Sequence, residues 1–216
     1  MPPIDWAKVK VVSWDIDGTF YDLKAFMSAL KRDLFLRAIT LRWWSLIRDL
    51  SRLIRFKRHM DWVRHHSEDF TVGNLEGRDE IGKTMADIYG RLLPSIGLLP
   101  GVADMLEWVA GQGVQQVVFS DYRQSTKLRA LGIEEHFEHV FAGEDLNHLK
   151  PSPTVFRAII DQLGVTPEEF LHIGDRQDTD GDAAPTVGFQ VAIIGRDFAT
   201  AAELHSLLVS QHDAIK

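Results

Sequence analysis

The chain has 216 residues, of which 45% are hydrophobic and 25% charged, and its net charge is −7. This composition is typical of a soluble globular protein, and the lack of cysteine excludes disulfides, thiolate nucleophiles and cysteine metal sites. The first residues, MPPIDWAKVK, lack the apolar core of a signal peptide, and no stretch reaches the roughly 18 uncharged apolar residues of a membrane span. We therefore expect a cytoplasmic protein without a membrane span.

The first predicted strand, VKVVSW, runs directly into clustered carboxylates in the sequence DIDGTFYD. Because side chains alternate along a strand, Asp15 and Asp17 leave it on the same side, and Gly18 lets the backbone turn. Two carboxylates this close repel each other unless they share a cation or a proton. The sequence also fits a simpler interpretation, an Asp-Gly turn with a helix N-cap at Thr19 or Asp22.

The next segment is predicted to be helical and is basic. No Gly or Pro occurs from Thr19 to Val72, which indicates long helices. Between Leu23 and Phe70, eleven Lys and Arg oppose five Asp and Glu, a local charge of +6, whereas the rest of the chain carries −13. Two regions with different partners are therefore expected.

This helical segment has an amphipathic pattern. At 100° per residue, one face collects Phe35, Leu36, Ile39, Trp43, Leu46, Ile47, Leu50, Leu53 and Ile54, and the opposite side collects Arg37, Arg48, Arg52 and Arg55. We expect the apolar face to be buried and the four arginines to be solvated, pointing away from the active site. A docking face for an acidic partner, nucleic acid or an anionic membrane is the alternative.

After Pro100, short apolar runs alternate with amphipathic segments. The predicted strands are VKVVSW, QQVVFS, HVFAG, EFLHIG and QVAII, and the predicted helices are 101–112, 123–131, 152–163 and 198–210. This alternation predicts an α/β fold with a doubly wound parallel sheet. Ligands of such sheets bind at the carboxyl ends of the strands, where Asp15, Ser120 and Asp175 are expected.

Four separated motifs resemble those of the haloacid dehalogenase-like hydrolases, in that family's order. They are DIDGT at 15–19, Ser120 closing VVFS, Lys150 in LKPSPTVF, and GDRQDTD at 174–180. Connecting phrases extend the resemblance over residues 9–20 and 96–195. It implies a core domain of residues 1–20 and 97–216, with a smaller all-helical cap domain, residues 21–96, inserted between the first and second motifs. Such a cap closes over the active site and selects the substrate.

The resemblance also implies a role for each motif. Asp15 would be the nucleophile that forms an aspartyl phosphate, and Asp17 the general acid and base. Ser120, with backbone amides near Asp17 and Asp121, would bind the phosphate, and Lys150 would neutralise Asp15 and the phosphate.

Mg²⁺ is the implied cofactor. Its ligands would be the Asp15 carboxylate, the Asp17 backbone carbonyl and Asp175, with Asp180 as a second ligand or supporting partner. The family also has a shorter spacing in this motif, which would select Asp178 in place of Asp180.

Two departures from the family pattern stand out. Asp121 adds a carboxylate beside the phosphate site, and Arg123 is expected to compensate it. Pro185 interrupts the helix expected after the fourth motif. The nine histidines show no defensible ligand spacing and receive no role.

The resulting prediction is a Mg²⁺-dependent hydrolase of a small phosphorylated metabolite, with no nucleic acid partner expected. A dehalogenase is disfavoured because that branch of the family lacks the second acid, here Asp17. A phosphomutase on the same scaffold and a non-catalytic binding or regulatory protein are the alternatives, and the oligomeric state is left open.

Overall fold

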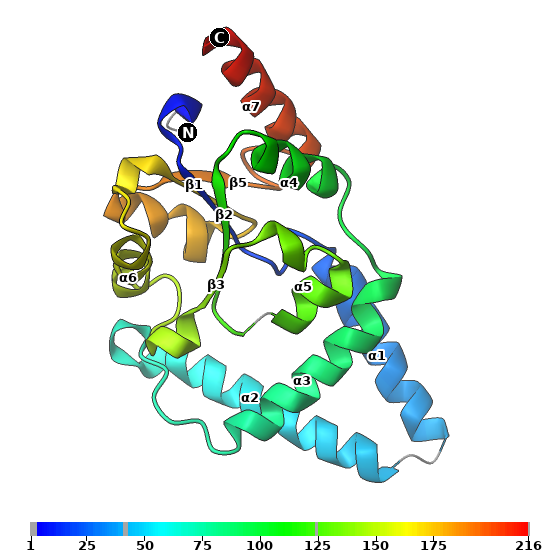
Figure 1. The fold of residues 1–216 in the computed structure, drawn as a ribbon. Helices are drawn as coiled ribbons and strands as arrows, with labels where there is room; N and C mark the ends of the chain where they lie inside the picture. Colours follow the sequence, from blue (N-terminus) through cyan, green and yellow to red (C-terminus); the bar gives the residue numbers. More distant parts are fainter. Residues whose placement is uncertain (1–3, 41–42, 124, 216) are drawn as a thin grey trace.

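A computed structural model describes residues 4–40, 43–123 and 125–215. Its centre is a parallel five-stranded sheet in the order β3-β2-β1-β4-β5 (Figure 1). The strands are β1 (Val11–Trp14), β2 (Gln115–Ser120), β3 (His139–Ala142), β4 (Phe170–Gly174) and β5 (Gln190–Ile193). All five lie within the predicted apolar runs, so the expected α/β class is confirmed.

Helices cover both faces of this sheet. They are α4 (Val102–Gly111), α5 (Ser125–Leu131), α6 (Pro153–Leu163) and α7 (Ala201–Ile215), each within a few residues of its predicted range. Val12 and Trp14 of β1 join one apolar core with α4 and α7, while Val11 joins a second core with α6. Because successive side chains of a strand point to opposite faces, the doubly wound sheet has an apolar core on each side.

Short helical turns connect these elements. They lie at Trp6–Lys8, Glu68–Phe70, Leu93–Ser95, Glu134–His136, Gly143–Leu146, Pro167–Glu169, Gln177–Gly181 and Ala184–Val187. The last two replace the helix expected after the fourth motif, where Pro185 lies in the first turn of the short helix Ala184–Val187.

Three helices inserted between β1 and β2 form a separate layer below the sheet in Figure 1, which we call the cap. They are α1 (Leu23–Ile39), α2 (Trp43–His66) and α3 (Arg78–Leu92). Asp22 caps α1, because its carboxylate accepts hydrogen bonds from the backbone N–H groups of Lys24 and Ala25.

The predicted burial of the amphipathic face is wrong. Seven of its nine apolar residues are exposed: Phe35, Leu36, Ile39, Trp43, Ile47, Leu50 and Ile54. Arg37, by contrast, is buried against Asp33 and Asp49, and Arg52 turns toward Glu80 and Thr84 of α3. Of the four arginines, Arg48 and Arg55 are solvated.

The helix break explains the error. The pattern was extended as one helix from residue 35 to residue 55, but α1 ends at Ile39 and α2 begins at Trp43. The hairpin folds back, and Arg37 of α1 meets Asp49 of α2 at 2.6 Å. This ion pair, which the periodicity could not reveal, decides which side faces inward.

Polar contacts of Arg64 and Asp69 help to fasten the cap to the core. Arg64 of α2 lies 3.4 Å from Asp121, directly after β2. Asp69 accepts hydrogen bonds of 2.8 Å from the hydroxyls of Ser152 and Thr154, at the start of α6. The cap is therefore held over the carboxyl ends of the strands.

Candidate active site

The predicted site residues from four motifs gather at the carboxyl edge of the sheet. Asp15 directly follows β1, Ser120 ends β2, and Asp175 directly follows β4. Lys150 reaches them from the loop before α6. Parallel strands end at the same edge, which explains why residues 160 positions apart in the sequence come together.

Lys150 is the centre of this cluster. Its ammonium nitrogen lies 2.8 Å from Asp15 Oδ1 and 2.6 Å from Asp180 Oδ1, and the side chain is fully buried. Its backbone N–H donates to Asp121 Oδ1 at 2.8 Å. The ammonium is thus shared by two carboxylates, and the backbone of the same residue binds a third.

This charge imbalance perturbs the cluster's pKa values. Burial raises the pKa of Asp15 to about 8, against the attraction of Lys150, and the charges of Asp180 and Asp17 add to the increase. Burial and the charge of Asp180 raise the pKa of Asp175 to about 6. The pKa of Asp180 is instead lowered, because Lys150 and His172 outweigh its burial. The site therefore has more negative charge than its lysine neutralises.

A divalent cation would neutralise the excess negative charge of this cluster. Carboxylate oxygens of Asp15, Asp175 and Asp180 lie within 4.8 Å of one another. Asp175 Oδ1 is buried, and no described residue donates a hydrogen bond to it. An added Cβ at Gly18 would lie 2.0 Å from Asp175 Oδ2, so only glycine allows this carboxylate its position. An oxygen-rich, electron-rich set of this kind suits a hard cation.

The structure brings Asp180, not Asp178, into the cluster. The Asp180 side chain is 1% exposed, whereas that of Asp178 is 67% exposed and pairs with Arg176 outside the cluster. The turn Gln177–Gly181 points Asp180 back under β4, where Gly174 leaves room for its carboxylate.

Asp17 lies in a second polar cluster that the sequence did not reveal. Its Oδ1 accepts hydrogen bonds from Lys127 Nζ at 2.5 Å and from the Tyr21 hydroxyl. Lys127 is buried and lies 4.2 Å from the centre of the Tyr89 ring. Burial acts to raise the pKa of Asp17, but Lys127 and Tyr21 outweigh it and lower the pKa. Lys127 and Tyr21 thus favour the ionised form of this carboxylate.

His172 is a second residue that was missed. Its Nε2 lies 3.0 Å from Asp180 Oδ1, and its Nδ1 lies 2.6 Å from the Ser13 hydroxyl. Burial lowers the pKa of His172, so a neutral ring donates to Asp180 and accepts from Ser13. The sequence does contain a signal for His172, because it is a polar residue inside the apolar strand FLHIG. Lys127 gives a similar signal, because it lies next to Leu128 on the buried side of α5.

Asp121 is compensated differently from the prediction. Arg64 of the cap and the Lys150 backbone N–H approach its carboxylate. The predicted partner, Arg123, instead pairs with Asp145 at 2.7 Å. Burial raises the pKa of Asp121 despite these contacts. Ser120, the other residue expected to bind phosphate, is buried at the end of β2.

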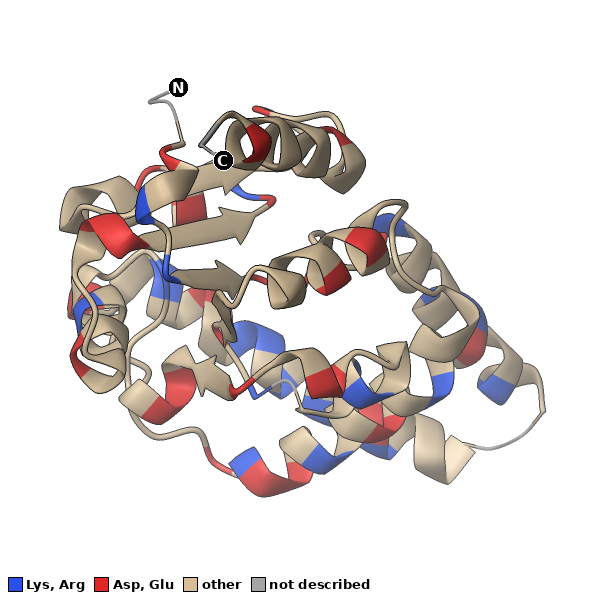
Figure 2. Ribbon diagram, turned by 45° about the horizontal axis from the view of Figure 1, so that its top comes forward, with Lys and Arg blue, Asp and Glu red and all other residues tan. Residues whose placement is uncertain are grey.

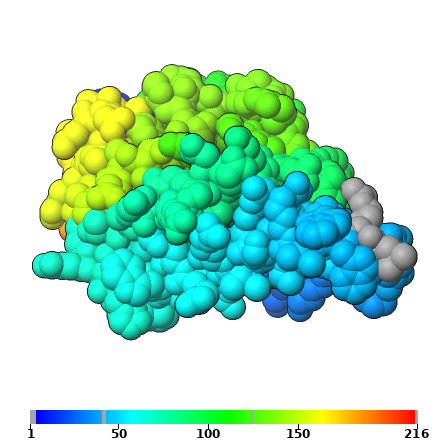
Figure 3. All heavy atoms as spheres, turned by 90° about the horizontal axis from the view of Figure 1, so that it is seen from below, coloured from blue at the N-terminus to red at the C-terminus, as the bar shows by residue number. Residues whose placement is uncertain are grey.

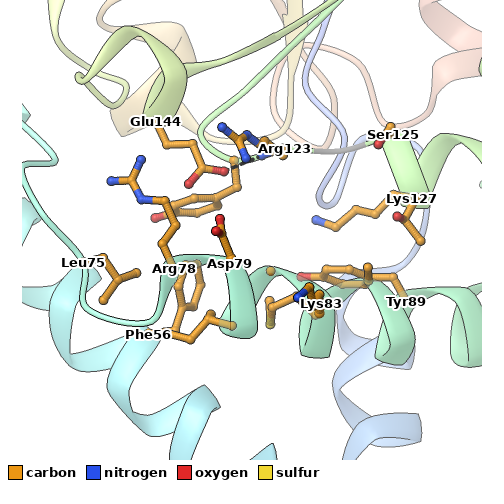
Figure 4. A pocket seen from close by; sticks show the side chains of 16 residues that line it. Phe56, Leu75, Arg78, Asp79, Lys83, Tyr89, Arg123, Ser125, Lys127 and Glu144 are labelled. Atoms are coloured by element: carbon orange, nitrogen blue, oxygen red, sulfur yellow. Dashed lines mark hydrogen bonds between the residues drawn. The ribbon is translucent and has the colours of Figure 1, made fainter.

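A pocket of about 420 Å³ opens between cap and core beside these clusters (Figure 4). The cap contributes Phe56 and one face of α3, and the core contributes α5 and the segments after β2 and β3. Its lining includes four cations, Arg78, Lys83, Arg123 and Lys127, and two acids, Asp79 and Glu144. Lys127 both lines the pocket and binds Asp17, so the pocket lies next to the carboxyl edge of the sheet.

Known proteins resemble this chain in sequence and in fold. A phosphoglycolate phosphatase of Pseudomonas putida is 31% identical over 107 residues, which are 48% of this chain and 39% of that protein. The chain thus matches about two fifths of this relative's length. The Escherichia coli phosphoglycolate phosphatase is 24% identical over 83% of this chain and 79% of its own.

The fold comparison agrees with these sequence matches. The crystal structure of a HAD phosphatase from Thermococcus onnurineus superposes with a TM-score of 0.65 and 23% identity, over 93% of this chain and 98% of that one. The sequence model of a haloacid dehalogenase-like hydrolase matches residues 9–188, which include all four motifs. The chain therefore belongs to the haloacid dehalogenase-like hydrolases.

Proposed function

We propose that the protein is a Mg²⁺-dependent phosphomonoesterase that acts on a small phosphorylated metabolite through an aspartyl phosphate at Asp15. The observation that carries this proposal is the bridge from Lys150 to Asp15 and Asp180 at the strand ends, with Asp17 two residues from the nucleophile. Such an arrangement suits phosphoryl transfer, which depends mainly on positioning and charge neutralisation.

The first step is attack on phosphorus. Lys150 holds Asp15 Oδ1, so attack falls to Oδ2, which forms the bond to phosphorus as the ester oxygen leaves. Ser120 and the backbone amides near Asp17 and Asp121 bind the phosphoryl oxygens, and Lys150 offsets their charge in the transition state.

Asp17 moves the proton in both steps. Lys127 and Tyr21 occupy its Oδ1, which leaves Oδ2 for proton transfer. In its protonated form, Asp17 passes this proton to the leaving alkoxide as the bond to phosphorus breaks. The carboxylate that results accepts a proton from the water that hydrolyses the aspartyl phosphate.

Asp15, the Asp17 backbone carbonyl and Asp175 would hold Mg²⁺, and Asp180 would support them. When bound, the cation neutralises the carboxylates and the phosphate oxygens. His172 and Lys150 fix Asp180, so this carboxylate orients Lys150 whether or not it contacts the cation.

The cap pocket would receive the remainder of the substrate. Its four cations favour a small anionic metabolite, and phosphoglycolate phosphatases among the relatives support the same substrate size. We accordingly assign residues 1–20 and 97–216 to a catalytic core domain and residues 21–96 to a cap domain that selects the substrate.

A phosphatase assay tests the proposal. The purified chain is stripped with EDTA, and phosphate release from p-nitrophenyl phosphate and a panel of metabolite monoesters is measured with and without added Mg²⁺. We expect release that depends on Mg²⁺ and exceeds the EDTA-treated rate by at least about a hundredfold.

Two outcomes would contradict the assignment. Positional isomerisation of a sugar phosphate without net phosphate release would identify a phosphomutase. Binding of phosphate esters with no turnover under any metal would identify a non-catalytic binding protein.

A further inference from the structure

The outer side of the α1–α2 hairpin carries a large exposed apolar surface. We call it the apolar patch; it consists of Phe35, Leu36, Ile39, Trp43, Trp44, Ile47, Leu50 and Ile54. Trp44 is 90% exposed and Phe35 is 64% exposed. Seen from below, α2 lies along the uncovered surface of the cap (Figure 3). Exposed apolar surface of this extent marks an interaction site.

The patch is continuous across the two helices. Trp43, Ile47, Leu50 and Ile54 recur every three or four residues, so they form one stripe along α2. The contact between Arg37 and Asp49 brings α1 alongside, with Leu36 and Leu50 each one residue from this ion pair and both exposed.

The exposed charges around the patch are mainly positive, with Asp61 as an exposed acid farther along α2. The exposed charged residues described between positions 23 and 58 are Lys24, Lys31, Arg32, Arg48, Arg55, Lys57 and Arg58. The two acids in this range, Asp33 and Asp49, turn inward and pair with Arg37. Between positions 23 and 58 the outer surface is therefore apolar and cationic. In Figure 2, Lys and Arg segments recur along the cap helices, with Asp and Glu segments among them.

We propose that this face of the cap docks onto an anionic membrane surface. An interfacial amphipathic helix inserts Trp, Phe and Leu side chains among the lipid headgroups while Lys and Arg contact anionic lipids. Tryptophan favours this depth, because its ring is apolar and its N–H is polar. Trp43, Trp44 and Phe35 supply the inserting side chains, and the seven cations supply the attraction.

Other occupants fit this surface less well. A second copy docked through the same patch would bring one cationic rim against another, and like charges across an interface oppose association. A nucleic acid would satisfy the cations but would leave most of the aliphatic side chains without an apolar partner. No described helix is both long and apolar enough to cross a bilayer, so docking would take place at the surface.

Vesicle sedimentation with the full chain tests the proposal. We expect the protein to bind phosphatidylcholine vesicles that contain about 30% phosphatidylglycerol and to bind pure phosphatidylcholine at least tenfold more weakly, with binding that weakens as salt is added. The pair Trp44→Ser and Ile47→Ser should weaken binding at least tenfold, and so should the set Lys31→Gln, Arg32→Gln, Lys57→Gln and Arg58→Gln.

The matched control replaces exposed residues of the core, Val140→Ser with Lys8→Gln, and should bind like the wild type. Circular dichroism and the turnover of p-nitrophenyl phosphate should be unchanged in all three variants. Failure to sediment with anionic vesicles would overturn the proposal. A dimer in light scattering that Trp44→Ser with Ile47→Ser dissociates would identify a second copy, and RNA or DNA binding lost in the four-charge variant would identify a nucleic acid.

Discussion

In the core, apolar side chains fill both faces of the sheet, and charge gathers at the ends of the strands. In the α1–α2 hairpin, Arg37 and Asp49 are buried while tryptophans and isoleucines face outward. The two regions also differ in charge balance. At the strand ends one lysine is shared among three carboxylates. In the hairpin, Asp33 and Asp49 share Arg37, and each has a second arginine, Arg91 or Arg48.

The pKa values of Asp15 and Asp49 differ in the direction expected from this difference in charge balance. Burial raises the pKa of Asp15 to about 8, because Lys150 does not neutralise the whole cluster. Burial of Asp49 acts in the same direction, but hydrogen bonds from Arg48 and Arg37 outweigh it and lower its pKa. The carboxylates at the strand ends lack enough positive charge nearby, so this cluster is suited to bind a cation and a phosphate. The buried charges of the hairpin neutralise one another and hold α1 and α2 together.

The largest expected effect comes from the unbalanced cluster. Asp15→Asn should lower phosphatase turnover more than about a hundredfold, because an amide cannot form the phosphoaspartate. Its melting temperature should not fall, since the change removes a carboxylate whose ionisation is disfavoured by burial. Asp178→Asn, at an exposed carboxylate outside the cluster, is the control and should keep nearly full activity. Turnover of Asp15→Asn above about a hundredth of wild type would argue against covalent catalysis.

Metal titration separates the acids of the fourth motif. Asp175→Ala should raise the Mg²⁺ concentration for half-maximal activity at least about tenfold, because this carboxylate has a buried oxygen without a protein donor. Asp180→Ala should have a similar or smaller effect, and Asp178→Ala less than about twofold. A defect in Asp178→Ala that exceeds both others would show that the shorter motif spacing applies.

The contribution of the buried ion pair between Arg37 and Asp49 to stability can be measured by replacing either arginine that contacts Asp49. Arg37→Met should lower the free energy of unfolding by about 3 kcal/mol, since Asp49 would stay buried with a single partner. Arg48→Met removes the exposed partner of the same carboxylate and should cost less than about 1 kcal/mol. Urea denaturation of both variants measures the difference. Equal losses would mean that burial of Arg37 contributes nothing to cap stability.

Acid should weaken the hairpin through Asp49. Its folded pKa lies below the usual 3.8, so its contribution to stability is present above that value and is lost as pH falls through the folded pKa. The difference in melting temperature between wild type and Asp49→Asn should therefore be largest near neutral pH and should shrink below about pH 4. A difference that stays constant from pH 7 to pH 3 would contradict this linkage.

The smallest effect is expected at the solvated arginines. Arg48→Gln with Arg55→Gln should leave turnover of a small phosphate ester within about twofold, because exposed charges are screened within about 10 Å at moderate salt. Neither residue lines the pocket. Arg78→Gln, which does line it, provides the comparison and should raise KM. A steep salt dependence of wild-type KM that the Arg48 and Arg55 changes abolish would place these arginines over the substrate.

The strand positions, and the edge of the sheet at which the candidate site lies, could be predicted from the sequence. Apolar runs of five to six residues ending in Asp15, Ser120 and Asp175 are local signals, and parallel strands must deliver their ends to one edge. Asp15 and Asp175 were predicted to be neighbours because each follows such an end, whereas Lys150, in the loop before α6, was predicted from the family resemblance.

Tertiary structure alone decided the rest. Lys127 reaches Asp17 from 110 positions away, and Arg64 of the cap reaches Asp121, so neither pairing leaves a periodic signal. For the same reason, the sequence pattern did not show which face of the α1–α2 hairpin is buried. Helical periodicity separates two faces of a helix but does not say which is buried. Here the ion pairs of Arg37 and Arg52 turn these two arginines inward, and the tryptophans face outward.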